Sequence, residues 1–346
     1  MPDVRNREML KQMQALPLDM KVRLTQDRIR EWYNYWGGQV YISFSGGKDS
    51  TVLLDIARKM YPDIEAVFVN TGLEYPEIRQ FVMGFENVTI LQPKKSFYEI
   101  LSAYGYPIVS KMISHNVSIA KRNPDGIVAK KLFSQTSGIY AMSKWKGLLS
   151  ERYNVSDQCC AYIKKQPAVE YTKKSGKMPV TAEMACESKS REKRWYESGC
   201  NAFDVKHAKS KPMSFWTEQD VLLYIKTNKL PIASVYGEVV YDVEDPQQER
   251  FDGYVTHKLK TTGCQRTGCT FCAFGAHLEK DSRFVRLADT HPKLYEYCIG
   301  GGEFDESGTW KPNKKGLGMG YVFDRLNELY GKDGKPFIRY KKEGDK

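Results

Sequence analysis

Six consecutive residues form the segment of this chain best suited to bind phosphate. They are Ser45, Gly46, Gly47, Lys48, Asp49 and Ser50. Glycines let backbone N–H groups turn inward around an anion, and a helix beginning at Asp49 would add its positive dipole end. The serine hydroxyls and the lysine add donors and charge, and Asp49 could hold a Mg²⁺ ion that bridges phosphates. An ordinary strand-to-helix turn is the alternative, but the complete hexapeptide favours a phosphate loop.

Cysteine spacing indicates a second chemical site. Five thiols are candidate metal ligands: Cys159, Cys160, Cys264, Cys269 and Cys272. A C-x-x-C pair places two sulfurs on one ion by local geometry, which suits zinc or an iron–sulfur cluster. Cys186, Cys200 and Cys298 stand apart, and we predict them to be buried structural thiols. His257 and His277 flank the downstream cysteines, but neither is expected to be a ligand.

Composition limits the class of protein. The 346 residues are 41% apolar and carry 53 Lys and Arg against 42 Asp and Glu, a net charge of +11. No apolar run approaches the roughly 18 residues of a membrane span, and the first residues lack the apolar core of a signal peptide. Eight cysteines are too dilute for a disulfide scaffold. We therefore expect a soluble, cytoplasmic protein that handles anions and makes no membrane contact.

The positive charge is concentrated in one segment. Residues 111–211 hold 20 Lys and Arg against 9 Asp and Glu, which leaves 33 of each sign elsewhere. A solvated lysine-rich insertion is one explanation. The other is a binding surface for a polyanion such as nucleic acid. The candidate contact residues on it are Lys121, Arg122, Lys130 and Lys131.

Alternating strands and helices must position these side chains. Strands are expected at 40–44, 65–69, 88–91 and 178–181, and helices at 49–60, 76–85, 97–103, 217–227 and 321–330. This rhythm predicts an α/β fold with a parallel sheet. The first 36 residues are predicted to be helical with a break at Pro17, and Thr217 to cap its helix together with Asp220. Residues 111–177 show no clear period, and 173–177 is predicted to be an exposed loop.

The phosphate segment differs from a Walker A motif and resembles the PP-loop of ATP pyrophosphatases, which split ATP into AMP and pyrophosphate. Five further segments resemble the phosphoadenosine phosphosulfate (PAPS) reductase-like branch of that superfamily, in the family's order. They are 69–77 (D-T-G-x-x-F-P-E in the family), 159–167 (C-C-x-x-x-K-x-x-P), 187–191 (E-S-x-x-R), 216–236 (W-x-x-x-D-V…L-P…Y) and 266–272 (R-x-G-C-x-x-C). The resemblance implies a PP-loop, adenine nucleotide alpha hydrolase-like fold.

The same resemblance assigns roles to residues. It implies that Asn70, which replaces the usual Asp, binds nucleotide together with Thr71 and Gly72. It also implies that Lys48, Asp49 and Arg191 act in catalysis; a surface salt bridge is the alternative role for Arg191. We expect three parts: a helical extension at 1–36, a PP-loop domain at 37–235, and a cysteine-rich segment at 236–346.

Several departures from the reductases shift the expected reaction. The hexapeptide keeps the ATP-type sequence, Ala182-Glu183-Met184 replaces the family's G-x-R, and no E-C-G-L-H motif follows Cys298. The chain therefore resembles the ATP-hydrolysing sulfur-transfer members. The resemblance implies ATP, Mg²⁺ and an enzyme that adenylates its substrate for sulfur transfer, with sulfur-donor or other partner proteins. A PAPS or adenylyl-sulfate reductase is the alternative, and a non-enzymatic nucleotide- or nucleic-acid-binding regulator is the second.

The resemblance also favours a [4Fe–4S] cluster, with zinc as the competitor. Comparison with the reductases gives Cys159, Cys160, Cys269 and Cys272 as ligands. Comparison with DNA phosphorothioation proteins gives one upstream cysteine plus Cys264, Cys269 and Cys272. We expect this second set, with Cys160 as the upstream ligand and Cys159 as its alternate.

Overall fold

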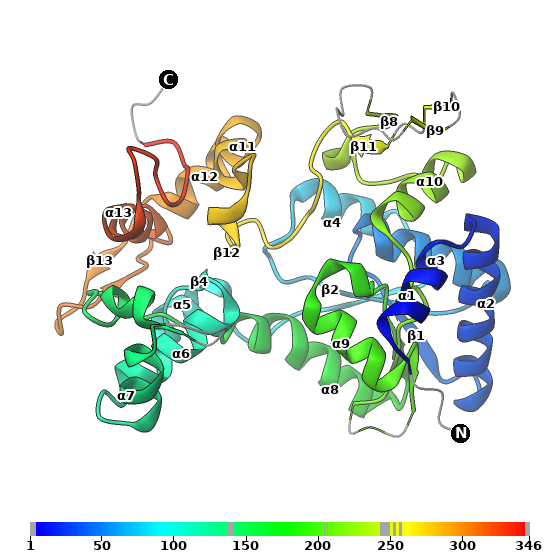
Figure 1. The fold of residues 1–346 in the computed structure, drawn as a ribbon, viewed down its shortest axis with the longest axis horizontal. Coiled ribbons are helices and arrows are strands. Elements are labelled where there is room, and N and C mark those ends of the chain that lie inside the picture. The colour runs from blue at the N-terminus through cyan, green and yellow to red at the C-terminus, as the bar shows by residue number, and fades with distance from the viewer. Residues whose placement is uncertain are drawn as a thin grey trace. The chain divides into compact units, whose positions relative to one another are not determined.

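The computed structural model describes residues 5–136, 141–203, 205, 207–242, 250–251, 254–255 and 258–342. The chain divides into two compact units. Unit 1 comprises residues 1–70, 74–92 and 168–267, and unit 2 comprises 71–73, 93–167 and 268–346. Figure 1 labels the elements of both.

A six-stranded sheet in the order β3-β2-β1-β5-β7-β6 organises unit 1. Every neighbouring pair is parallel except β6 with β7. The strands are β1 (Val40–Ser43), β2 (Ala66–Val69), β3 (Val88–Leu91), β5 (Met178–Val180), β6 (Asn201–Ala202) and β7 (Lys209–Ser210). Ile42 of β1 pairs with Ala66 of β2 and with Val180 of β5, which fixes the register at the centre. The predicted α/β class with a parallel sheet is confirmed.

Helices pack around this sheet in unit 1. They are α1 (Arg7–Gln14), α2 (Leu18–Tyr35), α3 (Lys48–Met60), α4 (Pro76–Met83), α8 (Gln166–Ser175), α9 (Lys189–Ser198) and α10 (Glu218–Asn228). Helix α3 contacts β1, α2 and α10. The 3₁₀ turns Ala185–Glu187 and Ser234–Tyr236 and the short strands β8 (Val239–Tyr241), β9 (Arg250–Phe251), β10 (Tyr254–Val255) and β11 (Leu259–Thr261) complete the unit.

Unit 2 is mainly helical. Its helices are α5 (Phe97–Tyr104), α6 (Lys111–Arg122), α7 (Ile127–Ser134), α11 (Arg283–Thr290), α12 (Pro292–Ile299) and α13 (Met319–Tyr330). It also has a 3₁₀ helix, η1 (Ser143–Leu149), a π-helix (Ala161–Lys165) and the 3₁₀ turn Ala276–Leu278. Strand β4 (Ile108–Val109) pairs in parallel with β12 (Ala273–Phe274), and β13 (Glu303–Phe304) pairs antiparallel with β14 (Trp310–Lys311).

The expected strands and helices outside 111–177 are confirmed, with ends shifted by a few residues. Thr217 caps α10 as predicted: its hydroxyl accepts from the Asp220 N–H, and the Asp220 carboxylate accepts from the Thr217 N–H. The predicted loop at 173–177 is wrong at its start, because residues 173–175 form the last turn of α8. Lysines at that turn favour the helix C-terminus electrostatically.

The division into units differs from the predicted parts. Leu10, Ile29 and Trp32 of the N-terminal helices are buried in the same core as strand residues Val40 and Ile42, so 1–36 is no separate extension. Unit 1 also runs past residue 235 to 267. Periodicity reveals which face of an element is apolar but not which core buries it, and the predicted boundaries therefore missed this arrangement.

Candidate functional site: a phosphate loop and a cysteine pocket

The predicted phosphate loop connects β1 to α3 within a few residues. Gly46 has a φ of +70°, and Gly47 is the N-cap residue of α3. The Ser45 and Ser50 hydroxyls lie 3.0 Å apart, and the Ser50 hydroxyl donates to the Gly47 carbonyl at 2.9 Å. These bonds hold the loop around the first turn of a helix, where N–H groups and the helix dipole favour an anion.

Gly46 is also needed for space. A Cβ at this position would lie 2.7 Å from Val82 Cγ2 and 2.9 Å from Ile78 Cγ2, both in α4. The left-handed backbone and the contact with α4 both exclude a larger residue. The sequence predicted a glycine turn, but the closeness of α4 is a property of the tertiary structure.

Lys48 points into the protein. It is only 5% exposed, and its Nζ lies 3.1 Å from Glu218 Oε1 and 2.9 Å from the Gln265 carbonyl oxygen. The ammonium also lies 5.4 Å from the centre of the Tyr236 ring. In this structure Lys48 therefore joins the loop to α10 and to residue 265, while its backbone N–H meets the Tyr236 hydroxyl at 3.4 Å.

Asp49 is the half-buried carboxyl of the loop. Burial raises the pKa of Asp49 and Glu218 adds to the increase, while Lys48, Arg266 and Arg191 oppose it. The balance is a raised pKa. A carboxyl group whose ionisation is disfavoured by burial is a natural ligand for a cation, because a bound cation restores the charged form.

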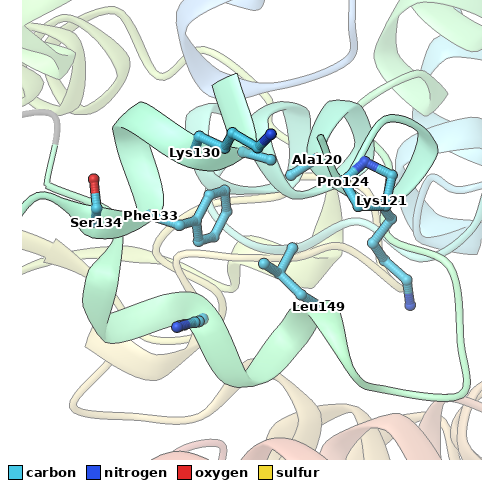
Figure 2. Close-up of a pocket in the computed structure, with 9 residues that line it drawn as sticks. Ala120, Lys121, Pro124, Lys130, Phe133, Ser134 and Leu149 are labelled. Carbon is cyan, nitrogen blue, oxygen red and sulfur yellow. The ribbon is translucent and has the colours of Figure 1, made fainter. Parts of the chain in front are cut away.

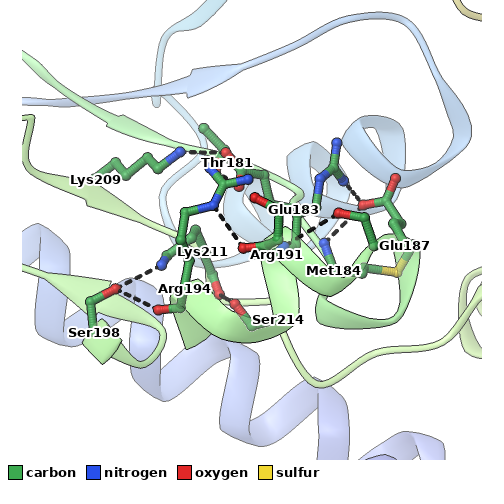
Figure 3. A network of polar contacts seen from close by, with 12 residues as sticks. Thr181, Glu183, Met184, Glu187, Arg191, Arg194, Ser198, Lys209, Lys211 and Ser214 are labelled. Carbon is green, nitrogen blue, oxygen red and sulfur yellow. Dashed lines mark hydrogen bonds and ion pairs between the residues drawn. The ribbon is translucent and has the colours of Figure 1, made fainter. Parts of the chain in front are cut away.

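Arg191 belongs to a network of charged side chains (Figure 3). It forms an ion pair with Glu187, one turn earlier in the chain. Glu183 lies in the same network, pairing with Lys209 and, at 3.5 Å, with Arg194 Nη1. Burial acts to raise the pKa of Glu183, but Lys209, Arg194 and Arg191 together outweigh it and lower that pKa. Arg191 thus takes part in a salt bridge and also lies within electrostatic reach of Asp49.

The remaining predicted nucleotide residues follow β2. The Asn70 N–H donates to the Leu91 carbonyl at 2.8 Å. Asn70 therefore lies at the carboxyl end of the sheet, the same end as the phosphate loop. Thr71 and Gly72 group with unit 2. The Thr71 hydroxyl accepts from the Leu73 N–H at 3.2 Å, and Gly72 has a φ of +74°.

Four residues that lie at the loop were not predicted from the sequence to be site residues. Glu218 and Gln265 bind Lys48, Arg266 acts on Asp49, and Tyr236 bonds to both Thr267 and the Lys48 N–H. Burial raises the pKa of Tyr236 to about 12, which keeps its hydroxyl protonated. The R-x-G-C and terminal Tyr positions of the family pattern were a signal for Arg266 and Tyr236.

Four cysteines line one pocket of unit 2, with a volume of about 20 Å³. They are Cys159, Cys160, Cys269 and Cys272. The Cys272 N–H donates to the Cys269 carbonyl at 3.0 Å in a tight turn before β12. A hydrogen bond from Cys159, with help from Lys111, Lys164 and Lys165, lowers the pKa of Cys160 to about 6. The same hydrogen bond and burial raise the pKa of Cys159, and burial raises that of Cys272 to about 11.

Cys264 lies in unit 1 and is 3% exposed, with its N–H bonded to the Val235 carbonyl at 2.9 Å. The structure thus brings together the four cysteines given by the reductase resemblance. Four thiols fit zinc or an iron–sulfur cluster by donor chemistry. Within the described ranges, however, no three His, Cys, Asp or Glu side chains are arranged to hold a metal ion directly.

The isolated cysteines differ in exposure. Cys200 and Cys298 are buried, as predicted. The prediction for Cys186 is wrong, because this residue is exposed, with its thiol donating to the Trp216 carbonyl at 3.3 Å. Burial raises the pKa of Cys186, and Asp49 adds to this, so the thiol belongs electrostatically to the phosphate-loop site. A single cysteine in a polar sequence gives no period from which its burial could be read.

No helix in the described part of the chain is both long and apolar enough to cross a membrane. Known proteins resemble the chain over most of its length. An uncharacterized protein of Methanocaldococcus jannaschii is 24% identical over 78% of this chain, which spans 50% of that relative. The adenosine 5'-phosphosulfate reductase of Staphylococcus haemolyticus is 23% identical over 65% of this chain and 82% of its own length.

The PAPS reductase of Candida auris, solved with phosphate, aligns with 16% identity and a TM-score of 0.35 over 66% of this chain and 90% of its own. The phosphoadenosine phosphosulfate reductase domain profile matches residues 39–109 and 110–274. These matched ranges include the phosphate loop, Arg191 and the four pocket cysteines. The chain belongs to the PAPS reductase-like family.

Proposed function

We propose that this protein is an ATP pyrophosphatase that adenylates an oxygen of its substrate so that sulfur can replace it. The observation that carries the proposal is the complete Ser45–Ser50 hexapeptide at the start of α3, with Asp49 in the electrostatic reach of Arg191 and Arg266. This combination offers backbone donors, hydroxyls, a cation ligand and two guanidinium groups to a triphosphate.

The proposed reaction balances without a protein nucleophile. A substrate oxygen attacks the α-phosphorus of ATP, the bond to the β-phosphate oxygen breaks, and pyrophosphate leaves. Hydrosulfide supplied by a sulfur donor then attacks the adenylated position, AMP leaves with the oxygen, and the sulfur takes its place. The loop binds the pyrophosphate portion, Asp49 holds Mg²⁺, and Arg191 and Arg266 neutralise the developing charge. Lys48 acts from inside the protein by holding the loop to Glu218.

The cysteine pocket is the proposed site of a [4Fe–4S] cluster, with zinc as the competitor. Its four thiols come from two segments of unit 2, and the lowered pKa of Cys160 favours a thiolate, the form that binds metal. Cys159, Cys160, Cys269 and Cys272 would be the ligands, in place of the set with Cys264. Such a cluster would supply a redox or sulfide-carrying centre.

Sulfonucleotide reduction is the second candidate, and the relatives named adenosine 5'-phosphosulfate reductase favour it. The nucleophiles first considered, Cys264 and Cys298, are 3% and 0% exposed. Exposed Cys186 near Asp49 is the better candidate. Sulfite release from adenylyl sulfate or PAPS with a dithiol reductant, lost in Cys186→Ala, would establish this reaction in place of ATP cleavage.

The deciding experiment measures pyrophosphate from ATP and Mg²⁺ with purified protein, with and without single-stranded RNA or DNA. Wild-type protein should release it, and Asp49→Ala should reduce the rate by about 100-fold or more, because a metal ligand is lost. Asp27→Ala, which removes an exposed carboxylate of α2, is the matched control and should leave the rate unchanged. If wild type binds nucleotide without releasing pyrophosphate, and Asp49→Ala binds it equally well, the protein would instead be a regulator.

A further inference from the structure

Unit 2 contains a cavity of about 370 Å³ that the proposed reaction does not use (Figure 2). Its walls come from the end of α6, from α7 and from η1. The lining residues are Ala120, Lys121, Pro124, Ala129, Lys130, Phe133, Ser134, Lys146 and Leu149. This volume lies in the range of small-molecule sites.

The interior of the cavity is apolar. The Phe133 ring of α7 and the Leu149 side chain of η1 both line it (Figure 2). Ala120 and Ala129 add small side chains, so the space between the helices is not filled. An apolar recess of this kind suits a flat, weakly polar group such as a nucleobase.

Lysines surround this interior, but they are not equivalent. The Lys121 ammonium donates to the carbonyls of Glu151 and Tyr153 at 2.6 and 2.7 Å, so Lys121 supplies its stem as a wall. Lys130 and Lys146 are exposed. Lys130 lies 3.2 Å from Asp125, but both side chains are largely in solvent, where such a pair contributes little.

The charge around the cavity is mainly positive. Residues 111–149 contain seven Lys and Arg and a single acid, Asp125. Lys131 and Lys144 are exposed on the same elements as the rim lysines. Such a surface attracts a polyanion, and a polyanion that also carries flat apolar groups is a single-stranded polynucleotide. An acidic polypeptide would match the charge but not the apolar recess.

We propose that the α6–α7 cavity and its rim bind a single-stranded polynucleotide, with one unpaired base in the cavity and phosphates on Lys130 and Lys146. The polynucleotide is then the substrate class of the adenylating enzyme, a step that rests on the proposed function. The binding itself does not depend on it.

Fluorescence anisotropy with labelled single-stranded RNA, single-stranded DNA and duplex DNA tests the proposal. Both single strands should bind more tightly than duplex, with affinity falling steeply between about 50 and 200 mM salt. Lys130→Glu/Lys146→Glu should weaken binding by about tenfold or more and reduce the salt slope by about 1 to 2. The matched control is Lys314→Glu/Lys315→Glu, an exposed pair elsewhere in unit 2 that should leave binding unchanged.

Ala129→Phe tests the cavity separately from the charge. Filling the recess should weaken single-strand binding while leaving the salt slope as in wild type, because no cation is lost. Thermal unfolding must show that this variant folds; the lysine variants, which change exposed residues, provide the test that does not depend on core packing.

Three results would overturn the proposal. The first is that Lys130→Glu/Lys146→Glu binds single strands as tightly as wild type, and the second is that the control pair weakens binding to the same extent. The third is that polyglutamate at the same charge concentration displaces RNA, which would indicate an acidic protein partner. Because binding is measured without ATP, Asp49→Ala should bind normally. Normal binding with no pyrophosphate release from wild type would contradict the proposed function and leave this inference standing.

Discussion

Neighbouring residues of the phosphate loop have opposite surroundings. Lys48 is buried against Glu218 and the Gln265 carbonyl, whereas Asp49 is half-buried with arginines in reach. Successive residues at a helix start lie about 100° apart around the axis, so one faces inward while the next faces the site. The charge of Lys48 therefore stabilises the loop, and the charge of Asp49 remains available to a ligand.

Asp49 gives a pH-dependent prediction for stability. Its pKa is higher in the folded than in the unfolded chain, so the folded state holds the proton more tightly, and stability contributed by this group falls as pH rises. In Asp49→Asn no buried carboxyl group has to ionise, so this loss of stability with rising pH is absent. We expect the variant to melt at a higher temperature than wild type at neutral pH, with the difference vanishing below the ordinary Asp pKa.

Differential scanning calorimetry across pH, without nucleotide or Mg²⁺, measures this effect. Asp27→Asn, on an exposed carboxyl of α2, should show no such trend and serves as control. A lower melting temperature for Asp49→Asn at neutral pH would show that ionised Asp49 stabilises the loop.

At the scale of elements, the phosphate loop depends on how α3 and α4 flank it. The Thr51 N–H and hydroxyl both bond to the Gly47 carbonyl at 3.0 Å, which closes the first turn of α3. Val82 and Ile78 of α4 press against Gly46 from the other side. The loop is held in its shape before any ligand binds, which is how a site reduces the cost of ordering on binding.

Gly46→Ala and Gly37→Ala separate backbone strain from crowding. Both glycines have positive φ, +70° and +55°, but only at Gly46 would a Cβ meet other atoms within 4 Å. Gly37→Ala should cost about 1–2 kcal/mol of stability with ATP turnover near wild type. Gly46→Ala should cost about 1–3 kcal/mol more and lose pyrophosphate release.

Urea unfolding gives the stability of both variants, and the pyrophosphate assay gives their turnover. Equal destabilisation in the two variants would mean that α4 yields to the added methyl group. Full turnover in Gly46→Ala would show that the loop conformation is not needed for ATP cleavage.

For the whole molecule, cysteines far apart in sequence meet in one unit. Cys159 and Cys160 come directly before the π-helix, Cys269 and Cys272 come before β12, and all four line the same pocket. Cys264 is only five residues before Cys269 but belongs to unit 1. Sequence proximity therefore did not predict which thiols line this pocket.

Metal content provides the corresponding prediction. Ser substitution of Cys160 or Cys272 should lower the iron or zinc bound per chain severalfold and weaken any visible charge-transfer absorption, because a soft ligand is removed. Cys264→Ser should retain the metal. Elemental analysis of anaerobically purified variants measures both outcomes and distinguishes iron from zinc. If Cys264→Ser loses as much metal as Cys272→Ser, Cys264 is a ligand and the ligand set expected from the sequence is correct.

The sequence by itself determined the local features of this protein. Alternating apolar residues specify β1, the hexapeptide 45–50 specifies the turn into α3, and Thr217 with Asp220 specifies the start of α10. Each depends on interactions between residues close in the chain, and each is confirmed. Helices α6 and α7 were not predicted, although Ile113, Val117 and Ala120 of α6 stand at helical spacing and are buried in unit 2.

Only the tertiary structure decided which distant residues share a site. Glu218 and Gln265 bond to Lys48 across 170 and 217 positions, and Arg266 acts electrostatically on Asp49 from a similar distance along the chain. The N-terminal helices join the sheet's core, and Cys264 groups with unit 1 whereas Cys269 groups with unit 2. Such choices depend on how whole elements fill a common core and on which charges become buried together. Neither property is encoded in the local spacing of residues.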